Sequence, residues 1–252
     1  RDTAKILYTT YIIMTILEIV LLLFGGMSLF DSAVHTFGTV GTGGFSVKNS
    51  SVGAYDSTYI HLVIGIFMIL SGVNFSLYYS LSKGKWKEVV KDEELKLYLG
   101  IITAAVILIA YNINKTMYHD IGLSLRDSFF QVSSIITTTG YATVDFDKWP
   151  TFSKGILFLL MFVGGCAGST GGGMKNIRIL VLLKLIKREV AKIFHPRAAI
   201  PIKTGDKVVP NETVASISSF FILYIIIFVL GTIVISLEGI DWAEVYCLGC
   251  SW

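Results

Sequence analysis

Long apolar stretches separated by short polar segments dominate the pattern along this chain. Stretches long enough to cross the roughly 30 Å hydrocarbon core of a bilayer lie at 6–24, 59–81, 97–113 and 214–237. A further stretch begins at 152–163, stops at a glycine-rich run and resumes at 177–186. The pattern predicts an all-α integral membrane protein that crosses the membrane several times and has one broken helix.

Two shorter amphipathic segments between these spans belong to an internal repeat. When 28–47 is aligned with 124–143 without a gap, six positions are identical: Ser, Leu, Asp, Ser, Thr and Gly, in that order. The two copies are 96 residues apart, which is the period of the repeat. The second copy predicts a short helix over 124–136, and we expect Asp31 and Asp127 to start the two short helices, where they suit the positive helix end. The order helix, pore helix with filter loop, helix therefore occurs twice, as in potassium channels, whose non-helical backbone lines a water-filled pore.

Each copy ends in a Thr-x-Gly-aromatic tract. Potassium-channel filters are T-V-G-Y-G loops whose carbonyls replace the water shell of the ion, and glycine allows the backbone angles that turn successive carbonyls toward one axis. A competing register, 39–43, is closer to T-V-G-Y-G letter by letter, but only the Gly44 register agrees with the second copy. We therefore predict the following filter residues: Thr42, Gly43, Gly44, Thr138, Thr139 and Gly140.

The broken span contains six glycines among the ten residues 164–173. Each glycine costs a helix up to about 1 kcal/mol relative to alanine, so a continuous helix is not expected there. Broken helices at mid-membrane depth mark transport sites and gates, whereas a plain kink or a tight packing surface would be purely structural. We predict an intramembrane gating loop made by Gly164, Gly165, Gly168, Ser169, Thr170, Gly171, Gly172 and Gly173.

Two enzyme motifs come close to this run without matching it. The sequence 168–175 departs from the Walker pattern because Met174 separates the last glycine from Lys175, and Asn176 replaces the Ser or Thr that binds magnesium. The sequence 167–171 approaches a nucleophile elbow around Ser169 but lacks its first glycine and its strand. We expect no enzyme; an intramembrane serine hydrolase stays a remote alternative, which labelling of Ser169 by a serine reagent would revive.

Composition agrees with the membrane prediction. Hydrophobic residues make up 53% and charged residues 15%, against about 25% charged in soluble domains, and mean hydropathy is +0.68. The net charge of +3 is small, and the basic residues cluster in two loops, so no nucleic-acid partner is expected. The positive-inside rule places these two loops, 83–94 and 189–212, in the cytoplasm.

Other polar residues have structural interpretations. Glu18 within the first span is interpreted as facing polar groups of a neighbouring helix, with an ion-pathway role as the alternative. His35 and His61 have no partner at ligand spacing and are expected to be packed. Three cysteines give neither a disulfide framework nor a metal site, so no cofactor is predicted: Cys166, Cys247 and Cys250.

Three runs together resemble a known family: Thr42-Gly-Gly-Phe-Ser46, Thr137-Thr-Thr-Gly-Tyr141 and Gly164-Gly-Cys-Ala-Gly-Ser-Thr-Gly-Gly-Gly-Met-Lys175, with His195-Pro196 beyond. They are similar to the membrane subunit of bacterial Trk-type potassium uptake systems, in the Trk/Ktr/HKT superfamily. The resemblance covers nearly the whole chain. It implies four helix–pore–helix repeats in one polypeptide, one filter glycine per repeat, here Gly44 and Gly140, and a gating loop below the filter in the third repeat. It also implies a homodimer that binds a cytoplasmic nucleotide-binding regulatory subunit.

On this basis the chain is expected to hold about two and a half of four repeats. Its parts are a second-repeat-like unit at 1–82, a cytoplasmic loop at 83–94, a third-repeat-like unit at 95–188, a second cytoplasmic loop at 189–212 and the start of a fourth repeat at 213–252. Asp241 would begin the next pore helix, and 247–252 does not continue the family pattern. Since a filter of this kind needs four loops around one axis, these residues alone are not expected to conduct selectively.

The expected function is potassium uptake across the cytoplasmic membrane, with the lipid bilayer as surroundings and K⁺ as cargo held only at the filter residues. Two alternatives stay open. One is sodium, because some family members carry Ser in the first filter, and the other is a cation-coupled secondary transporter.

Overall fold

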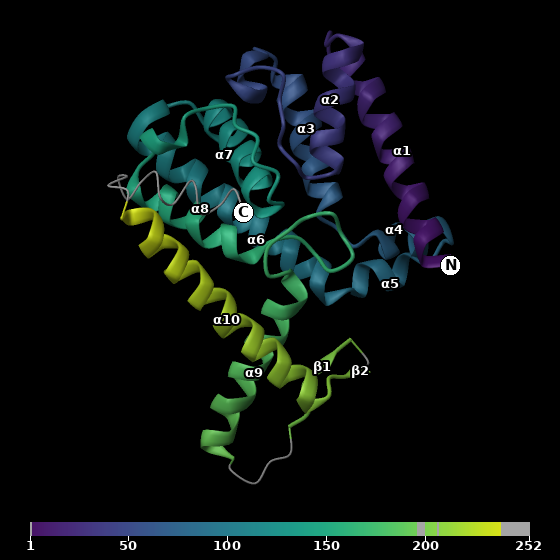
Figure 1. The fold of residues 1–252 in the computed structure, drawn as a ribbon, viewed down its shortest axis with the longest axis vertical. Coiled ribbons are helices and arrows are strands. Elements are labelled where there is room, and N and C mark those ends of the chain that lie inside the picture. Colours follow the sequence, from purple (N-terminus) through teal and green to yellow (C-terminus); the bar gives the residue numbers. More distant parts are fainter. Residues whose placement is uncertain (1, 196–199, 206, 238–252) are drawn as a thin grey trace.

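The computed structural model describes residues 2–195, 200–205 and 207–237, and most of this chain is helical (Figure 1). The long elements are α1 (Asp2–Phe24), α2 (Leu29–Val40), α3 (Thr58–Ser71), α4 (Phe75–Ser82), α5 (Trp86–Lys91), α6 (Glu93–Ile113), α7 (Ile121–Ile136), α8 (Thr151–Val163), α9 (Asn176–Phe194) and α10 (Asn211–Ser236). Short helical turns lie at Ser51–Ala54, Asn114–Tyr118 and Phe146–Lys148. Two-residue strands β1 (Lys203–Thr204) and β2 (Lys207–Val208) pair antiparallel.

Three described helices, α1, α6 and α10, are long and apolar enough to cross a membrane. The shorter apolar helix α8 ends at the glycine-rich run, and α9 follows it, so the predicted break in this span is present. Figure 1 shows α1, α2, α3 and α7 running side by side, while α9 and the β1–β2 hairpin project at the opposite end. The prediction of a multi-pass helical membrane protein is confirmed.

The expectation of one continuous helix over 59–81 is wrong. The chain bends by 92° between α3 and α4. Asn74 causes the restart, because its side-chain oxygen accepts a hydrogen bond from the backbone N–H of Ser76 at 2.9 Å and so caps α4. The bend leaves the backbone carbonyls of 71 and 72 without helical partners, and these carbonyls accept hydrogen bonds from the glycine-rich loop, as described below.

The prediction that Asp127 starts the second short helix is also wrong. The cap of α7 is Asp120, whose Oδ1 accepts hydrogen bonds from the N–H groups of Gly122 at 2.7 Å and Leu123 at 3.1 Å. Asp127 lies farther along the helix, is buried and pairs with Arg126 at 2.7 Å. The prediction assumed that both short helices begin at the same position of the repeat, but α7 begins earlier in its repeat than α2 does.

Asp31, in contrast, lies in the first turn of α2 as predicted, and its backbone N–H donates to the side-chain oxygen of the cap residue Ser28 at 3.1 Å. Its Oδ2 accepts a hydrogen bond from the hydroxyl of Tyr55 at 2.7 Å. Partial burial, followed by this bond and the nearby negative charge, raises the pKa of Tyr55 to about 12. The phenol therefore remains a donor at neutral pH and ties the outer loop to the start of α2.

Replacing Asp120 by Ala is expected to destabilise the first turn of α7 by about 1 kcal/mol, because two backbone N–H groups lose their acceptor. Amide hydrogen exchange at 121–124 in the full-length protein should become several times faster. Asp56→Ala, at an exposed loop aspartate, is the control and should leave exchange in α7 unchanged. Unchanged exchange at 121–124 in the Asp120 variant would contradict the assignment of this cap.

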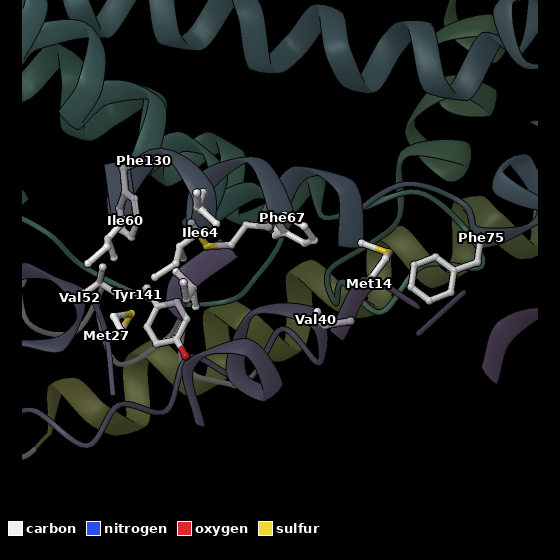
Figure 2. Close-up of a cluster of buried hydrophobic side chains, with 13 residues drawn as sticks. Met14, Met27, Val40, Val52, Ile60, Ile64, Phe67, Phe75, Phe130 and Tyr141 are labelled. Atoms are coloured by element: carbon white, nitrogen blue, oxygen red, sulfur yellow. The ribbon is translucent and has the colours of Figure 1, made fainter. Parts of the chain in front are cut away.

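Two buried clusters form the core, and the first one joins the repeats. It contains side chains of α1, α2 and α3 together with Phe130 and Tyr141 from the second repeat (Figure 2). The second cluster lies between α6, α7 and α8 and includes Tyr98, Ile109, Ile136 and Leu157. Because α7 contributes to both clusters, the two copies pack as one unit.

The region 189–212, predicted as a plain loop, contains more structure than expected. Helix α9 continues to Phe194, and the β1–β2 hairpin precedes α10. A small cluster of Val181, Ile202 and Val214 packs α9, the hairpin segment and α10 together. The division of the chain at 82, 94, 188 and 212 stays a prediction, and the proposed start of a pore helix at Asp241 and the residues 247–252 lie outside the described residues.

Candidate functional site

The two Thr-x-Gly tracts adopt the same backbone conformation. The angle φ is positive at Thr42 (53°) and Gly44 (66°), and again at Thr138 (59°) and Gly140 (89°), while the residue between has negative φ in both copies. A positive φ is a genuine outlier for a β-branched residue such as threonine and costs energy that the surroundings must supply. Two such outliers at equivalent positions indicate that the tracts are held in this conformation by specific contacts.

The hydrogen bonds of the tracts repeat with the same period of 96 residues. In each copy one carbonyl near the end of the short helix accepts from two successive N–H groups of the tract. The pairs are Gly43 and Gly44 to the oxygen of Gly38, at 2.8 and 3.3 Å, and Thr139 and Gly140 to the oxygen of Ser134, at 2.9 and 3.4 Å. The backbone hydrogen bonds therefore repeat in the register that aligns Gly44 with Gly140, whereas the competing register at 39–43 ends inside this turn.

The two tracts pack against each other. A Cβ added at Gly44 would overlap the carbonyl oxygen of Thr139. The hydroxyl of Tyr141, in the second tract, donates to two backbone oxygens of the first repeat. These are the oxygens of His35 and Phe45, each 3.1 Å from the hydroxyl oxygen. His35 is fully buried beside the Tyr141 ring, and His61 is buried beside Phe130, so both histidines are packed residues.

A cavity of about 720 Å³ lies between the tracts, the glycine-rich loop, α8 and α10. All six predicted filter residues line it, together with Thr170, Gly172 and Gly173 of the loop. The other predicted gating residues do not line it: Gly164, Gly165, Gly168, Ser169 and Gly171. The remaining wall is formed by Gly41, Phe45, Ser134, Ile135, Phe158, Met161, Phe162, Tyr224 and Phe228. The structure thus brings both tracts and part of the loop to one space.

The glycine-rich loop contacts a threonine in each of the two tracts. The hydroxyl of Thr42 donates to the carbonyl oxygen of Thr170 at 3.0 Å, and the N–H of Gly172 donates to the hydroxyl oxygen of Thr138 at 2.7 Å. These are the two threonines with positive φ. The loop therefore supports the strained positions of both tracts at once.

On its other side the loop is hydrogen-bonded to the bend between α3 and α4. The N–H of Cys166 donates to the oxygen of Gly72 at 2.8 Å, and the N–H of Phe75 donates to the oxygen of Gly168 at 3.1 Å. The hydroxyl of Thr170 donates to the oxygen of Ser71 at 3.2 Å. Sequence reasoning missed these partners, although glycine and asparagine at 72 and 74 were a signal that the span could break.

Residues just after the loop also hold it. Asn176, fully buried, donates from its side chain to the oxygen of Gly164 at 2.7 Å and from its backbone to the oxygen of Gly165 at 2.9 Å. The ammonium of Lys175 donates to the oxygen of Gly171. The loop is thus a closed turn whose two ends meet.

The contacts of Ser169 do not favour a nucleophile. Ser169 donates its hydroxyl hydrogen to the carbonyl oxygen of Cys166 at 2.6 Å, whereas a nucleophilic serine needs a base as acceptor. Glu18 is fully buried in α1, and neither of its carboxylate oxygens has a hydrogen-bond partner among the described residues, so both interpretations of Glu18 stay predictions.

Comparisons with known proteins agree on one family. The model of the TrkH family, described as cation transport protein, matches residues 1–249. The Trk system potassium uptake protein TrkH of Salmonella typhimurium is 38% identical over 242 residues, which cover 95% of this chain and 50% of that protein. The Trk system potassium uptake protein TrkI of Halomonas elongata is 30% identical over 244 residues, covering 95% of this chain and 49% of that protein.

A solved structure gives the same answer. The crystal structure of the potassium transporter TrkH from Vibrio parahaemolyticus matches with a TM-score of 0.92 and 34% identity, over 99% of this chain and 54% of that one. The chain spans about half the length of the curated relatives it matches. From its sequence, its helices and these matches, the chain belongs to the TrkH family of cation transport proteins.

Proposed function

We propose that the full-length protein containing this chain takes up potassium through a carbonyl-lined filter to which 42–44 and 138–140 contribute. The observation that carries this proposal is the alternating sign of φ in both tracts, at equivalent positions and facing one cavity. Alternation of this kind turns successive carbonyls toward one axis, where they can replace the water shell of an ion. The relatives named potassium uptake proteins support K⁺ as the cargo.

The chemistry of the cavity wall favours a monovalent ion. The described residues that line it are threonine, serine, glycine and apolar or aromatic residues, without Asp, Glu, Lys or Arg. Divalent cations such as Ca²⁺ and Mg²⁺ are usually held by carboxylates, whereas K⁺ needs only neutral oxygens. K⁺ is here the cargo of the filter residues, and the proposal needs no resident cofactor and no catalytic residue.

We further infer that the loop 164–173 is the gate of this route. It contacts Thr42 and Thr138 on the cavity side, so it occupies the path by which an ion would leave these tracts. Its many hydrogen bonds to neighbouring backbone define one closed position. A two-state gate needs such a position, together with a second position that a regulator can favour.

The assembly around the chain is also part of the proposal. Four filter loops around one axis are needed, and this chain supplies two of them. The remaining loops are proposed to come from other repeats of the same polypeptide, in a homodimer embedded in the cytoplasmic membrane. A cytoplasmic nucleotide-binding subunit is the proposed regulator, and the basic segments 83–94 and 189–212 are proposed to face it.

Ion-competition uptake by the full-length protein tests the proposal. In cells that lack their own potassium uptake, radioactive rubidium should enter and be displaced by K⁺ far more effectively than by Na⁺, and co-expression of the regulatory subunit should change the rate. Equal displacement by Na⁺ would favour the sodium alternative. Uptake that saturates with a second, coupling ion, without channel-like conductance, would favour a coupled transporter.

A further inference from the structure

One buried carboxylate joins the glycine-rich loop to the start of α9. Glu94, in the first turn of α6, is only 6% exposed. Its Oε1 accepts hydrogen bonds from the N–H of Ala167 at 2.7 Å and from the N–H of Ile177 at 2.9 Å. Ala167 belongs to the loop and Ile177 to the first turn of α9, so a single oxygen holds both sides of the break.

The environment of Glu94 makes this contact strong. A buried carboxylate is costly unless it is hydrogen-bonded, and bonds from N–H groups to a charged oxygen are stronger than neutral ones. The N–H of Ile177 lies at the N-terminus of α9, where the helix dipole adds to the attraction for a negative group. Loss of the carboxylate would leave two buried N–H groups without an acceptor, and loss of the N–H groups would leave a buried charge without a hydrogen bond.

The preceding residue, Glu93, makes a second connection from the same turn of α6. Its Oε2 accepts a hydrogen bond from the N–H of Gly205 in the β1–β2 hairpin at 3.2 Å and forms an ion pair with Lys184 of α9. Lys184 also donates to the oxygen of Lys203 in β1 at 2.6 Å. Adjacent glutamates therefore hold the loop on one side and the hairpin on the other.

We propose that Glu94 is a positioning residue that latches the gating loop in its closed position, and that Glu93 links this latch to the β1–β2 hairpin. The proposal rests on the proposed function, in which 164–173 is the gate. A displacement of the hairpin or of α9 pulls on the first turn of α6 through Glu93. The same turn carries Glu94, so the displacement weakens the hold on the loop.

Substitutions at Glu94 in the full-length protein distinguish the effect of side-chain length on the loop from the effect of side-chain charge. Glu94→Gln keeps an oxygen at the same place and can still accept both N–H groups. Glu94→Asp keeps the charge but is one methylene shorter, so it cannot bridge Ala167 and Ile177 together. A latch made by hydrogen bonds predicts that Gln, which keeps both bonds but loses the charge, releases the loop less than Asp or Ala does. Glu88→Gln in α5, whose exposed carboxylate pairs only at the surface with Lys85, is the matched control.

The first readout does not depend on transport. Cys166 is fully buried in the loop next to Ala167, so its labelling by a small membrane-permeant maleimide reports opening of the loop. With every cysteine of the full-length protein except Cys166 replaced by serine, Cys247 and Cys250 included, Glu94→Asp and Glu94→Ala should label on the order of tenfold faster than the otherwise unchanged protein, because the local opening equilibrium shifts by the bonds lost. Glu93→Ala and Glu94→Gln should give smaller increases, and the Glu88→Gln variant none.

The second readout is rubidium uptake without the regulatory subunit, which should rise several-fold in the variants that label faster, while competition between K⁺ and Na⁺ stays unchanged. Labelling at the wild-type rate in Glu94→Asp and Glu94→Ala overturns the latch. Fast labelling of Glu94→Gln together with a wild-type labelling rate in Glu94→Asp also overturns the latch, because the charge of the side chain and not its length would then hold the loop. A wild-type rate in Glu93→Ala overturns the link to the hairpin. Faster labelling without any change in uptake supports the latch and contradicts the gate role in the proposed function.

Discussion

Gly140→Ser in the full-length protein is expected to lower the preference for K⁺ over Na⁺ by roughly fivefold to thirtyfold. Gly140 has a φ of 89°, and space around it is open, since a Cβ added there meets no atom within 4 Å. The substitution therefore adds no clash within this chain. It adds only the cost of a side chain at positive φ, about 1–2 kcal/mol, which is relieved if the backbone rotates and moves the carbonyls of 139 and 140. Relative displacement of rubidium by K⁺ and Na⁺ measures the effect.

The equivalent change in the first tract should behave differently. A serine at Gly44 has the same strain and also overlaps the carbonyl oxygen of Thr139. Gly44→Ser is therefore expected to abolish uptake, because the two tracts can no longer pack. Gly155→Ser, at an exposed glycine of α8 with open space around it, is the control and should change neither rate nor selectivity. Unchanged ion competition in Gly140→Ser would count against 138–140 as part of a filter.

The sequence predicted the register in which the two tracts correspond, because it contains its own comparison. Two copies 96 residues apart agreed on Gly44 and Gly140, and the hydrogen bonds to Gly38 and Ser134 repeat in the same register. The glycine-rich break was equally visible, because six glycines in ten residues exclude a stable helix whatever lies around them. Both features are local or internally repeated, so one sequence was sufficient.

The features that were missed depend on contacts between distant residues. The bend at 72–74 is stabilised by the loop of the next repeat, whose Cys166 and Thr170 bond to the carbonyls that the bend sets free. Glu94 reads as an ordinary acidic residue in a first helical turn, and only the fold brings it to Ala167 and Ile177. The repeat also misled in one respect, since it transferred a helix start from Asp31 to Asp127 although Asp120 is the cap.

Tyr141 shows why a motif residue can have more than one role. Its place in the Thr-x-Gly-aromatic tract was predicted, but its ring belongs to the core of the other repeat (Figure 2). From there its hydroxyl bonds to the oxygen of Phe45, the residue one period earlier. The aromatic position of one tract thus fixes the backbone at the end of the other.

Removal of residues 168–173 is expected to raise uptake on the order of tenfold in the absence of the regulatory subunit and to make the rate insensitive to that subunit. The deletion removes Thr170 and Gly172, which contact the filter threonines at the cavity wall, and so opens the route that the loop fills. The chain can close over the gap, because Gly165 and Asn176 are hydrogen-bonded at 2.9 Å and residues 166, 167, 174 and 175 suffice for a turn between them.

A second variant separates the bulk of the loop from its contacts. Thr170→Gly keeps the loop at its full length, because 168–173 is already Gly-Ser-Thr-Gly-Gly-Gly, but removes the hydroxyl of Thr170 and its bond to Ser71. A smaller rise in uptake than in the deletion is expected, because the segment still occupies the cavity but its closed position has lost one hydrogen bond. Uptake per molecule in the membrane is the quantity to compare. A fall in uptake in both variants, with normal amounts of protein in the membrane, would mean that the glycine-rich loop only packs the helices and that the gate lies elsewhere.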